Sequence, residues 1–163
     1  MEKIKWGIIG PGNIANNFAD GLKGSYSGQL VSIASKSEDR RKNFGDKYDI
    51  HPDFRFDSYE DIINSEHIDA IYISTPHTLH AQWTIKAAGK GKHILCEKPG
   101  AINFNEGKKI IDAVREAGVF YMEGFMYRCH PQIPKLVEII KSKIIGDVIS
   151  IETSFGFDMG KTI

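Results

Sequence analysis

The sequence predicts the α/β class, with a doubly wound parallel sheet followed by the truncated start of a second α/β domain with an open sheet. Apolar runs of strand length alternate with helical patterns, which is typical of β–α units in a parallel sheet. A glycine-rich turn directly follows the first apolar run, where such sheets bind nucleotides. The alternation ends near residue 120. We therefore expect one domain over residues 1–120 and the beginning of a second over 121–163.

The elements follow from hydrophobic periodicity and from glycine and proline signals. The expected strands are 4–9, 30–35, 69–75, 92–97 and 119–127, with a short strand within 51–56. The expected helices are 13–22, 38–48, 77–91 and 103–118, and Ser58 begins a further segment with a loose capping box. In the second domain, residues 131–144 read as an amphipathic helix and 148–157 as a strand with one wet face.

The composition excludes several classes of function. Lys+Arg and Asp+Glu are balanced at 21 each, so no net field favours nucleic acid or an anionic membrane. No apolar run approaches the length of a membrane span, and the first residues lack a signal-peptide pattern. The two cysteines form no disulfide framework, and the histidine pairs lack further ligands, so we expect no metal. A cytoplasmic, reducing location is the expectation.

The turn after the first strand fits the G-x-G-x-x-G/A pattern of dinucleotide sites. Its residues are Gly10, Pro11, Gly12, Asn13, Ile14 and Ala15. Gly10 permits the tight turn, Gly12 lets a pyrophosphate approach the backbone, and the small Ala15 allows close helix–strand packing. The following helix offers free N–H groups to the anion. The sequence therefore predicts a Rossmann domain, although an S-adenosylmethionine site can use a similar turn.

The end of the second strand distinguishes NADP from NAD. An NAD site usually places Asp or Glu there to bind the ribose hydroxyls, whereas this chain has Ser35 and Lys36, with Arg40 one turn into the next helix. A hydroxyl and cations receive a 2′-phosphate, which a carboxylate would repel. We therefore expect NADP, with NAD as a possible second cofactor. The alternative is that Lys36 and Arg40 belong to an ordinary solvated face.

Two strands end in polar residues before a proline, at residues 74–77 and 96–99. In an open α/β sheet, ligands bind at the carboxyl ends of strands. Lys98 therefore has two readings: a surface ion pair with Glu97, or a group delivered to a reacting atom. The glycine turn and the second polar strand end favour the functional reading.

At these residues the chain resembles the glucose–fructose oxidoreductase and inositol dehydrogenase family, Gfo/Idh/MocA. The resemblance rests on residues 10–15, STPHTLH (74–80), EKP (97–99) and EGFMYRCHPQ (123–132). It covers essentially the whole chain, and EKP at this distance from the glycine turn is its most specific element. It implies a two-domain NAD(P)-dependent oxidoreductase acting on sugars, polyols or diols.

The same resemblance implies roles for individual residues. Lys98 would hydrogen-bond the reacting hydroxyl or carbonyl, which agrees with the need for a polar group that takes the hydroxyl proton. The cofactor-binding residues that it implies are Ser74, Thr75, Pro76, His77, His80, Glu97, Lys98 and Arg128. The family completes its site with Asp and His from the second domain, and we expect these residues beyond residue 163. The fragment alone is therefore expected to be inactive, and the whole protein to pair into homo-oligomers through its second domain.

Two other functions compete with this reading. One is a non-catalytic nucleotide-binding sensor or regulator, which would keep the fold without the chemistry. Lys98 argues against it for the parent protein. The other is a methyltransferase-type fold that uses S-adenosylmethionine, which the basic residues after the second strand and the EKP motif disfavour.

Overall fold

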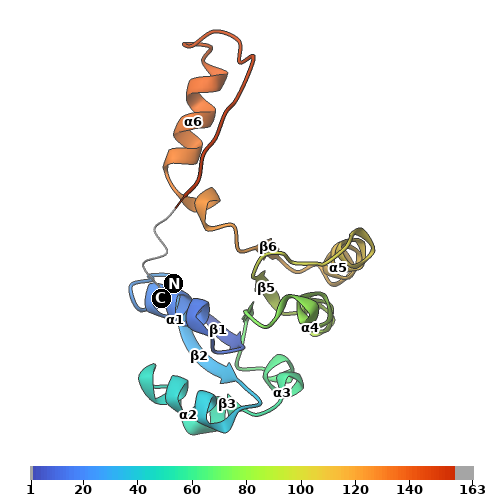
Figure 1. Cartoon of the computed structure of the whole chain (residues 1–163). Coiled ribbons are helices and arrows are strands. Elements are labelled where there is room, and N and C mark those ends of the chain that lie inside the picture. The colour runs from blue at the N-terminus through green and yellow to red at the C-terminus, as the bar shows by residue number, and fades with distance from the viewer. Residues whose placement is uncertain (1, 157–163) are drawn as a thin grey trace, which may run out of the picture. The chain divides into compact units, whose positions relative to one another are not determined.

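The computed structural model describes residues 2–156, and Figure 1 shows how the elements follow one another along the chain. The chain divides into two compact units, Met1–Gly124 and Phe125–Ile163. The first unit carries the whole sheet. Each unit is described by itself below.

The sheet of the first unit has six parallel strands in the order β3-β2-β1-β4-β5-β6. The strands are β1 Ile4–Ile9, β2 Gly28–Ala34, β3 Arg55–Phe56, β4 Ala70–Ile73, β5 His93–Cys96 and β6 Tyr121–Glu123. This is the strand order of a doubly wound dinucleotide-binding sheet. Strands β1 to β3 are added toward one side of the sheet, and strands β4 to β6 are added on the other side of β1. The predicted fold class is confirmed.

Helices connect the strands, as parallel pairing requires. They are α1 Asn13–Lys23, α2 Glu38–Lys47, α3 Tyr59–Asn64, α4 His80–Ala88 and α5 Phe104–Ala117, with short 3₁₀ helices η1 Pro52–Phe54 and η2 His77–Leu79. Their ends are set by local chemistry: the Ser58 hydroxyl caps α3, and Gly118 ends α5 with a φ of 64°. The predicted helix 77–91 is divided, because it begins as η2 and becomes α-helical only at His80.

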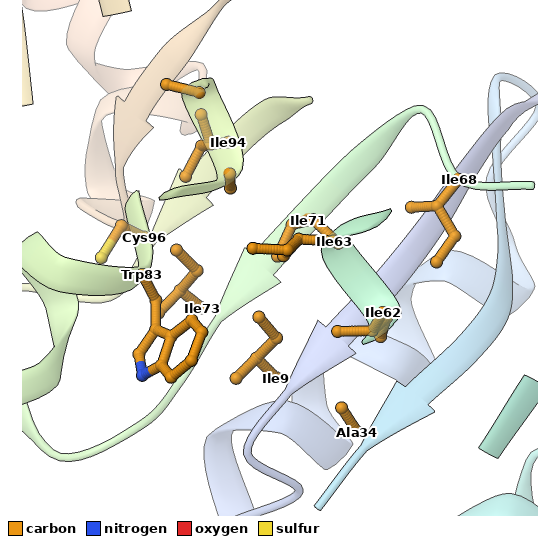
Figure 2. Close-up of a cluster of buried hydrophobic side chains, with 12 residues drawn as sticks. Ile9, Ala34, Ile62, Ile63, Ile68, Ile71, Ile73, Trp83, Ile94 and Cys96 are labelled. Atoms are coloured by element: carbon orange, nitrogen blue, oxygen red, sulfur yellow. The ribbon is translucent and has the colours of Figure 1, made fainter. Parts of the chain in front are cut away.

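Two hydrophobic cores lie on the two faces of the sheet, because successive residues of a strand point to opposite sides. Ile9 belongs to the core shown in Figure 2, where it packs with Ile73, Trp83 and other side chains of β4 and α4. Ile8 belongs to the other core, with Ala15 and further residues of α1 and α2. The sheet is thus covered on both faces by side chains of its own helices, and the carboxyl edge of the strands remains the place for a ligand.

β6 is shorter than the predicted strand 119–127. Its ladder ends with the bond from the Gly124 N–H to the Cys96 carbonyl, at 2.8 Å. β5 stops at Cys96, so β6 has no partner further along. The Glu123 carboxylate instead accepts the N–H of Gly100 at 2.7 Å.

The second unit contains η3, Met126–Cys129, and α6, Gln132–Lys141, within the predicted helix 131–144. The predicted strand over 148–157 is wrong for residues 148–156, which form neither strand nor helix, and residue 157 lies outside the described residues. A strand needs a neighbour for its backbone hydrogen bonds, and the described part of this unit contains no other strand. Across residues 2–156, no helix is long and apolar enough to cross a membrane.

Candidate functional site

Three strand ends meet at one edge of the sheet. β1, β4 and β5 are neighbours, and their last residues pair in register, Ile9 with Ile73 and Ile73 with Cys96. Because the strands are parallel, the residues that follow them emerge at the same level. The turn that begins at Gly10, the Ser74 turn and the Glu97–Pro99 segment therefore form one rim, which we call the carboxyl edge.

The glycine turn has the geometry that a pyrophosphate site requires. Gly10 has a φ of 90°, and a Cβ at this position would lie 3.0 Å from the Ser74 carbonyl oxygen. A Cβ on Gly12 would meet nothing within 4 Å, so this side of the turn is open. Gly12 is also the N-cap of α1, which has neither a side-chain cap nor an acidic residue in its first turn. The uncapped helix end can receive an anion.

The remaining residues of the turn differ in how far they are buried. Ala15 is fully buried against the sheet, which agrees with its expected role in close packing. Pro11 and Ile14 are half-buried, and Asn13 is exposed at the start of α1. The structure therefore brings the whole predicted motif together on the edge.

The two residues that follow β4, Ser74 and Thr75, are half-buried and buried, respectively. The Ser74 hydroxyl donates to the Gly10 carbonyl at 2.8 Å and lies 3.3 Å from the Ile9 carbonyl, so it ties the glycine turn to β4. Thr75 is buried, and its hydroxyl has no hydrogen-bond partner in the structure. Pro76 and His77 are exposed. The Thr75 hydroxyl oxygen is enclosed, so it lies behind the edge rather than on its open surface.

The two residues that follow β5 differ in exposure, since Glu97 is half-buried and Lys98 is exposed. Glu97 accepts a 2.6 Å hydrogen bond from the Tyr72 hydroxyl through Oε1, whereas Lys98 is exposed. Within residues 2–156, no salt bridge involves the Lys98 ammonium. The surface ion pair between Glu97 and Lys98 is therefore not formed. In the described part of the chain, the lysine therefore lies on the edge without an ionic partner.

Burial controls the titration of the groups beneath this edge. Burial, followed by the neighbouring Glu97 carboxylate, raises the pKa of Tyr72 well above its usual range. Burial likewise raises the pKa of the Cys96 thiol to about 12. Tyr72 therefore remains a hydrogen-bond donor to Glu97, and Cys96 is a core thiol rather than a nucleophile.

His80 occupies a different place from that of a residue lining the edge. It is fully buried, and both of its ring nitrogens contact backbone carbonyls: Nδ1 lies 2.8 Å from the Pro99 oxygen, and Nε2 lies 2.8 Å from the Thr75 oxygen. Neither nitrogen is left for a cofactor. The geometry favours a supporting role for His80 behind the edge.

A second cluster follows β2. Lys36 and Arg40 are exposed, whereas Ser35 is buried and its hydroxyl accepts the Ser37 N–H at 3.3 Å. The Lys36 ammonium lies 5.9 Å from the ring centroid of Tyr59. Burial raises the pKa of Tyr59, and the positive charge of Arg40 opposes that rise. Lys36 thus lies beside the Tyr59 ring and the charge of Arg40 acts on the same tyrosine, while the Ser35 hydroxyl bonds the backbone.

Arg41, the neighbour of Arg40, is not part of this exposed pair. Its guanidinium donates to the Ser35 carbonyl at 2.7 Å. Of the predicted site residues, only Arg128 lies in the second unit, where it is exposed on η3. No group of three or more potential metal-binding side chains occurs among residues 2–156.

Sequence reasoning missed two residues near the edge. Tyr72 is the hydrogen-bond partner of Glu97, and Tyr59 lies beside Lys36. A tyrosine in the otherwise aliphatic strand β4, two residues before its polar end, was the available signal for Tyr72. Tyr59 follows the helix cap Ser58, and only the fold brings it to the end of β2.

The residues of the edge fit a bound dinucleotide. Gly12 leaves an open approach, and the first turn of α1 is uncapped. These features would hold a pyrophosphate at the start of α1. Two further cations, Lys36 and Arg40, are exposed just after β2.

Known proteins resemble this chain in sequence and in fold. The chain is 34% identical over 159 residues to trans-1,2-dihydrobenzene-1,2-diol dehydrogenase of Xenopus tropicalis, covering 96% of this chain and 48% of that protein. It is 34% identical over 154 residues to D-xylose 1-dehydrogenase (NADP(+)) 2 of Haloferax volcanii, covering 94% and 46%. The crystal structure of KijD10, a 3-ketoreductase from Actinomadura kijaniata, in complex with NADP has a TM-score of 0.79 at 30% identity, covering 89% of this chain and 46% of that chain.

This chain spans about half the length of the curated relatives that it matches. The family profile described as "Oxidoreductase family, NAD-binding Rossmann fold" matches residues 4–125, which include the complete sheet and the carboxyl edge. The resemblance based on the glycine turn and the EKP motif is confirmed. The chain therefore belongs to the Gfo/Idh/MocA family of oxidoreductases.

Proposed function

We propose that this chain is the cofactor-binding half of an NADP-dependent oxidoreductase that acts on a sugar, polyol or diol. The bound nicotinamide would accept hydride from a carbinol or donate it to a carbonyl. The dehydrogenase relatives support this reaction class, since the names of two of them specify a diol and D-xylose as substrates. No observation favours the alternative of a non-catalytic sensor.

The proposal rests mainly on Lys98, whose side chain is exposed on the carboxyl edge. Among residues 2–156 its ammonium has no ionic partner, although a carboxylate is the adjacent residue in the sequence. Tyr72 holds that carboxylate through a 2.6 Å bond. Lys98 is therefore available on the same rim as the glycine turn. In this role the Nζ of Lys98, as the ammonium, donates a proton to the oxygen of a carbonyl that is reduced, or, as the neutral amine, receives the proton of a hydroxyl that is oxidised.

Binding of the cofactor would be shared between two corners of the edge. The backbone around Gly10 and Gly12 binds the pyrophosphate at the start of α1. Lys36 and Arg40 receive the adenosine 2′-phosphate, which is why we propose NADP over NAD. Glu97 is held by Tyr72 and keeps the backbone before Lys98 in place.

The nicotinamide end would lie along the β4 and β5 ends, where Pro76 and His77 are exposed and the buried Thr75 directly precedes them. We propose that the second domain begins after β6, near Phe125, a few residues later than the expected residue 121. That domain would supply the remaining acid–base groups and the substrate contacts. Subunit pairing through the same domain would complete the assembly.

Replacing Lys98 tests the proposal. In protein that includes any coding sequence following residue 163, Lys98→Ala should lower turnover of a diol or D-xylose with NADP⁺ by about 10²–10⁴-fold, the usual contribution of an acid–base group. The affinity for NADPH should change by less than about twofold, because Lys98 is not placed on the phosphates. Lys90→Ala, at an exposed lysine just after α4, is the matched control. Unaltered turnover in the Lys98 variant would refute the proposed role.

A further inference from the structure

His80 joins two segments that are distant in sequence. Its Nε2 lies 2.8 Å from the carbonyl oxygen of Thr75, in the turn after β4, and its Nδ1 lies 2.8 Å from the carbonyl oxygen of Pro99. Pro99 directly follows Lys98. The imidazole thus spans the interval between the β4 turn and the backbone that carries the proposed catalytic lysine.

The two contacts place a chemical requirement on the ring. A backbone carbonyl only accepts hydrogen bonds, and a neutral imidazole donates from only one of its nitrogens. With one proton, the second contact would set a nitrogen lone pair against a carbonyl lone pair at 2.8 Å. Only the imidazolium, with a proton on each nitrogen, satisfies both contacts.

The surroundings of the ring do not offer another function. His80 is fully buried, so it cannot touch a substrate on the exposed rim. The other titratable ring in contact with it is His77, at a centroid separation of 5.6 Å. Both nitrogens are committed to main-chain oxygens from two different loops, so a change in the ring alters the spacing of those loops.

We propose that His80 is a positioning residue, held as an imidazolium, that clamps the Thr75 turn to the Pro99 carbonyl and so fixes the backbone beneath Lys98. The clamp itself depends only on the described geometry; its effect on turnover rests on the proposed oxidoreductase function. The competing interpretation is a core histidine that fills space and donates a single hydrogen bond. The two interpretations differ in the number of protons on the ring and in the mobility of the Lys98 segment.

The proton count can be measured on the unaltered chain. ¹⁵N NMR of the histidine side chains at pH 7 should show both ring nitrogens of His80 protonated, and the resonance is assigned by its loss in His80→Gln or by through-bond correlation. Because this measurement needs neither turnover nor a bound cofactor, it separates failure of the clamp from failure of the proposed function. One unprotonated ring nitrogen would overturn the clamp.

The effect on the loop is measured by hydrogen exchange. The Gly100 amide, which donates to Glu123 at 2.7 Å, lies two residues beyond Lys98. The single amide nitrogen of glutamine cannot replace two donors on opposite sides of a ring. In His80→Gln, exchange of the Gly100 amide should therefore accelerate by at least about tenfold, as in local opening. Exchange within α2, on the opposite face of the sheet from α4, should be unchanged. His67→Gln, at an exposed histidine before β4, is the matched control.

In protein that turns over, His80→Gln should lower kcat by roughly tenfold to a hundredfold, the scale for a misplaced catalytic group, and leave the NADPH Kd within about twofold. A histidine that only fills the core would lower the melting temperature without changing Gly100 exchange or the kcat of the folded enzyme. Unchanged exchange or unchanged kcat would overturn the positioning role. If His80→Gln does not fold, the NMR result on the unaltered chain decides.

Discussion

The ends of β4 and β5 look alike in sequence, since each carries polar residues before a proline, but the structure uses them differently. After β4, Ser74 turns inward and its hydroxyl holds the glycine turn through the Gly10 carbonyl. After β5, Glu97 turns inward to Tyr72, whereas Lys98 is exposed and has no salt bridge within residues 2–156.

The comparison shows how the carboxyl edge can combine a fixed main chain at the β4 end with an accessible side chain at the β5 end. The Ser74 hydroxyl fixes the spacing of the main chain at the β4 end, because it donates to a backbone carbonyl of the glycine turn. The β5 end then presents one flexible cation from that fixed base. Residues of the first kind should therefore affect stability, and residues of the second kind should affect binding or turnover.

The largest expected effects on stability and cofactor binding are at the two glycines of the turn, of which Gly10 supports the fold and Gly12 leaves room for the cofactor. Gly10→Ala should destabilise the fold by roughly 2 kcal/mol, because its φ of 90° disfavours a side chain and its Cβ would press on the Ser74 carbonyl. Gly12→Ala should leave the melting temperature nearly unchanged, since its Cβ enters open space, but weaken NADPH binding by at least about tenfold. Thermal denaturation and fluorescence titration of both variants check this pair.

If Gly12→Ala binds NADPH normally, the pyrophosphate does not approach this face of the turn. If Gly10→Ala is as stable as the unaltered chain, the packing of the turn on the β4 end contributes little. Either result would remove part of the contrast between the two strand ends.

A smaller effect separates Ser74 from Lys98. Ser74→Ala should cost about 1 kcal/mol of unfolding free energy, because the hydroxyl donates to a carbonyl in a part-buried position. Lys98→Ala should change the unfolding free energy by less than about 0.5 kcal/mol, the usual range for an exposed side chain without such features. Urea denaturation of the two variants measures both values. Equal losses of unfolding free energy in the two variants would mean that Ser74 supports the fold no more than Lys98 does.

Local features of the site could be predicted from the sequence. The glycine turn is one continuous segment between a strand and a helix, so residue type and spacing are sufficient to place it. The strand ends were predictable because a proline after polar residues stops an apolar run. The all-parallel topology then put Ser74 and Lys98 on one rim.

Contacts across the sheet could not be predicted in this way. Tyr72 meets Glu97 because β4 and β5 pair with Ile73 opposite Cys96, and that register is not visible in the sequence. His80 was expected near the cofactor, but the start of α4 turns it toward two backbone carbonyls. The predicted strand over 148–157 followed from residue alternation alone, which does not supply the neighbour that a strand requires.

The central claim is that the carboxyl edge binds a dinucleotide with a 2′-phosphate beside Lys36 and Arg40. Fluorescence titration of the chain with NADPH and NADH tests it most directly, with Lys36→Glu as the variant that should abolish the preference. We expect NADPH to bind at least about tenfold more tightly than NADH, a difference of roughly 1.4 kcal/mol. Equal affinities, a preference for NADH, or no binding of either would contradict the account.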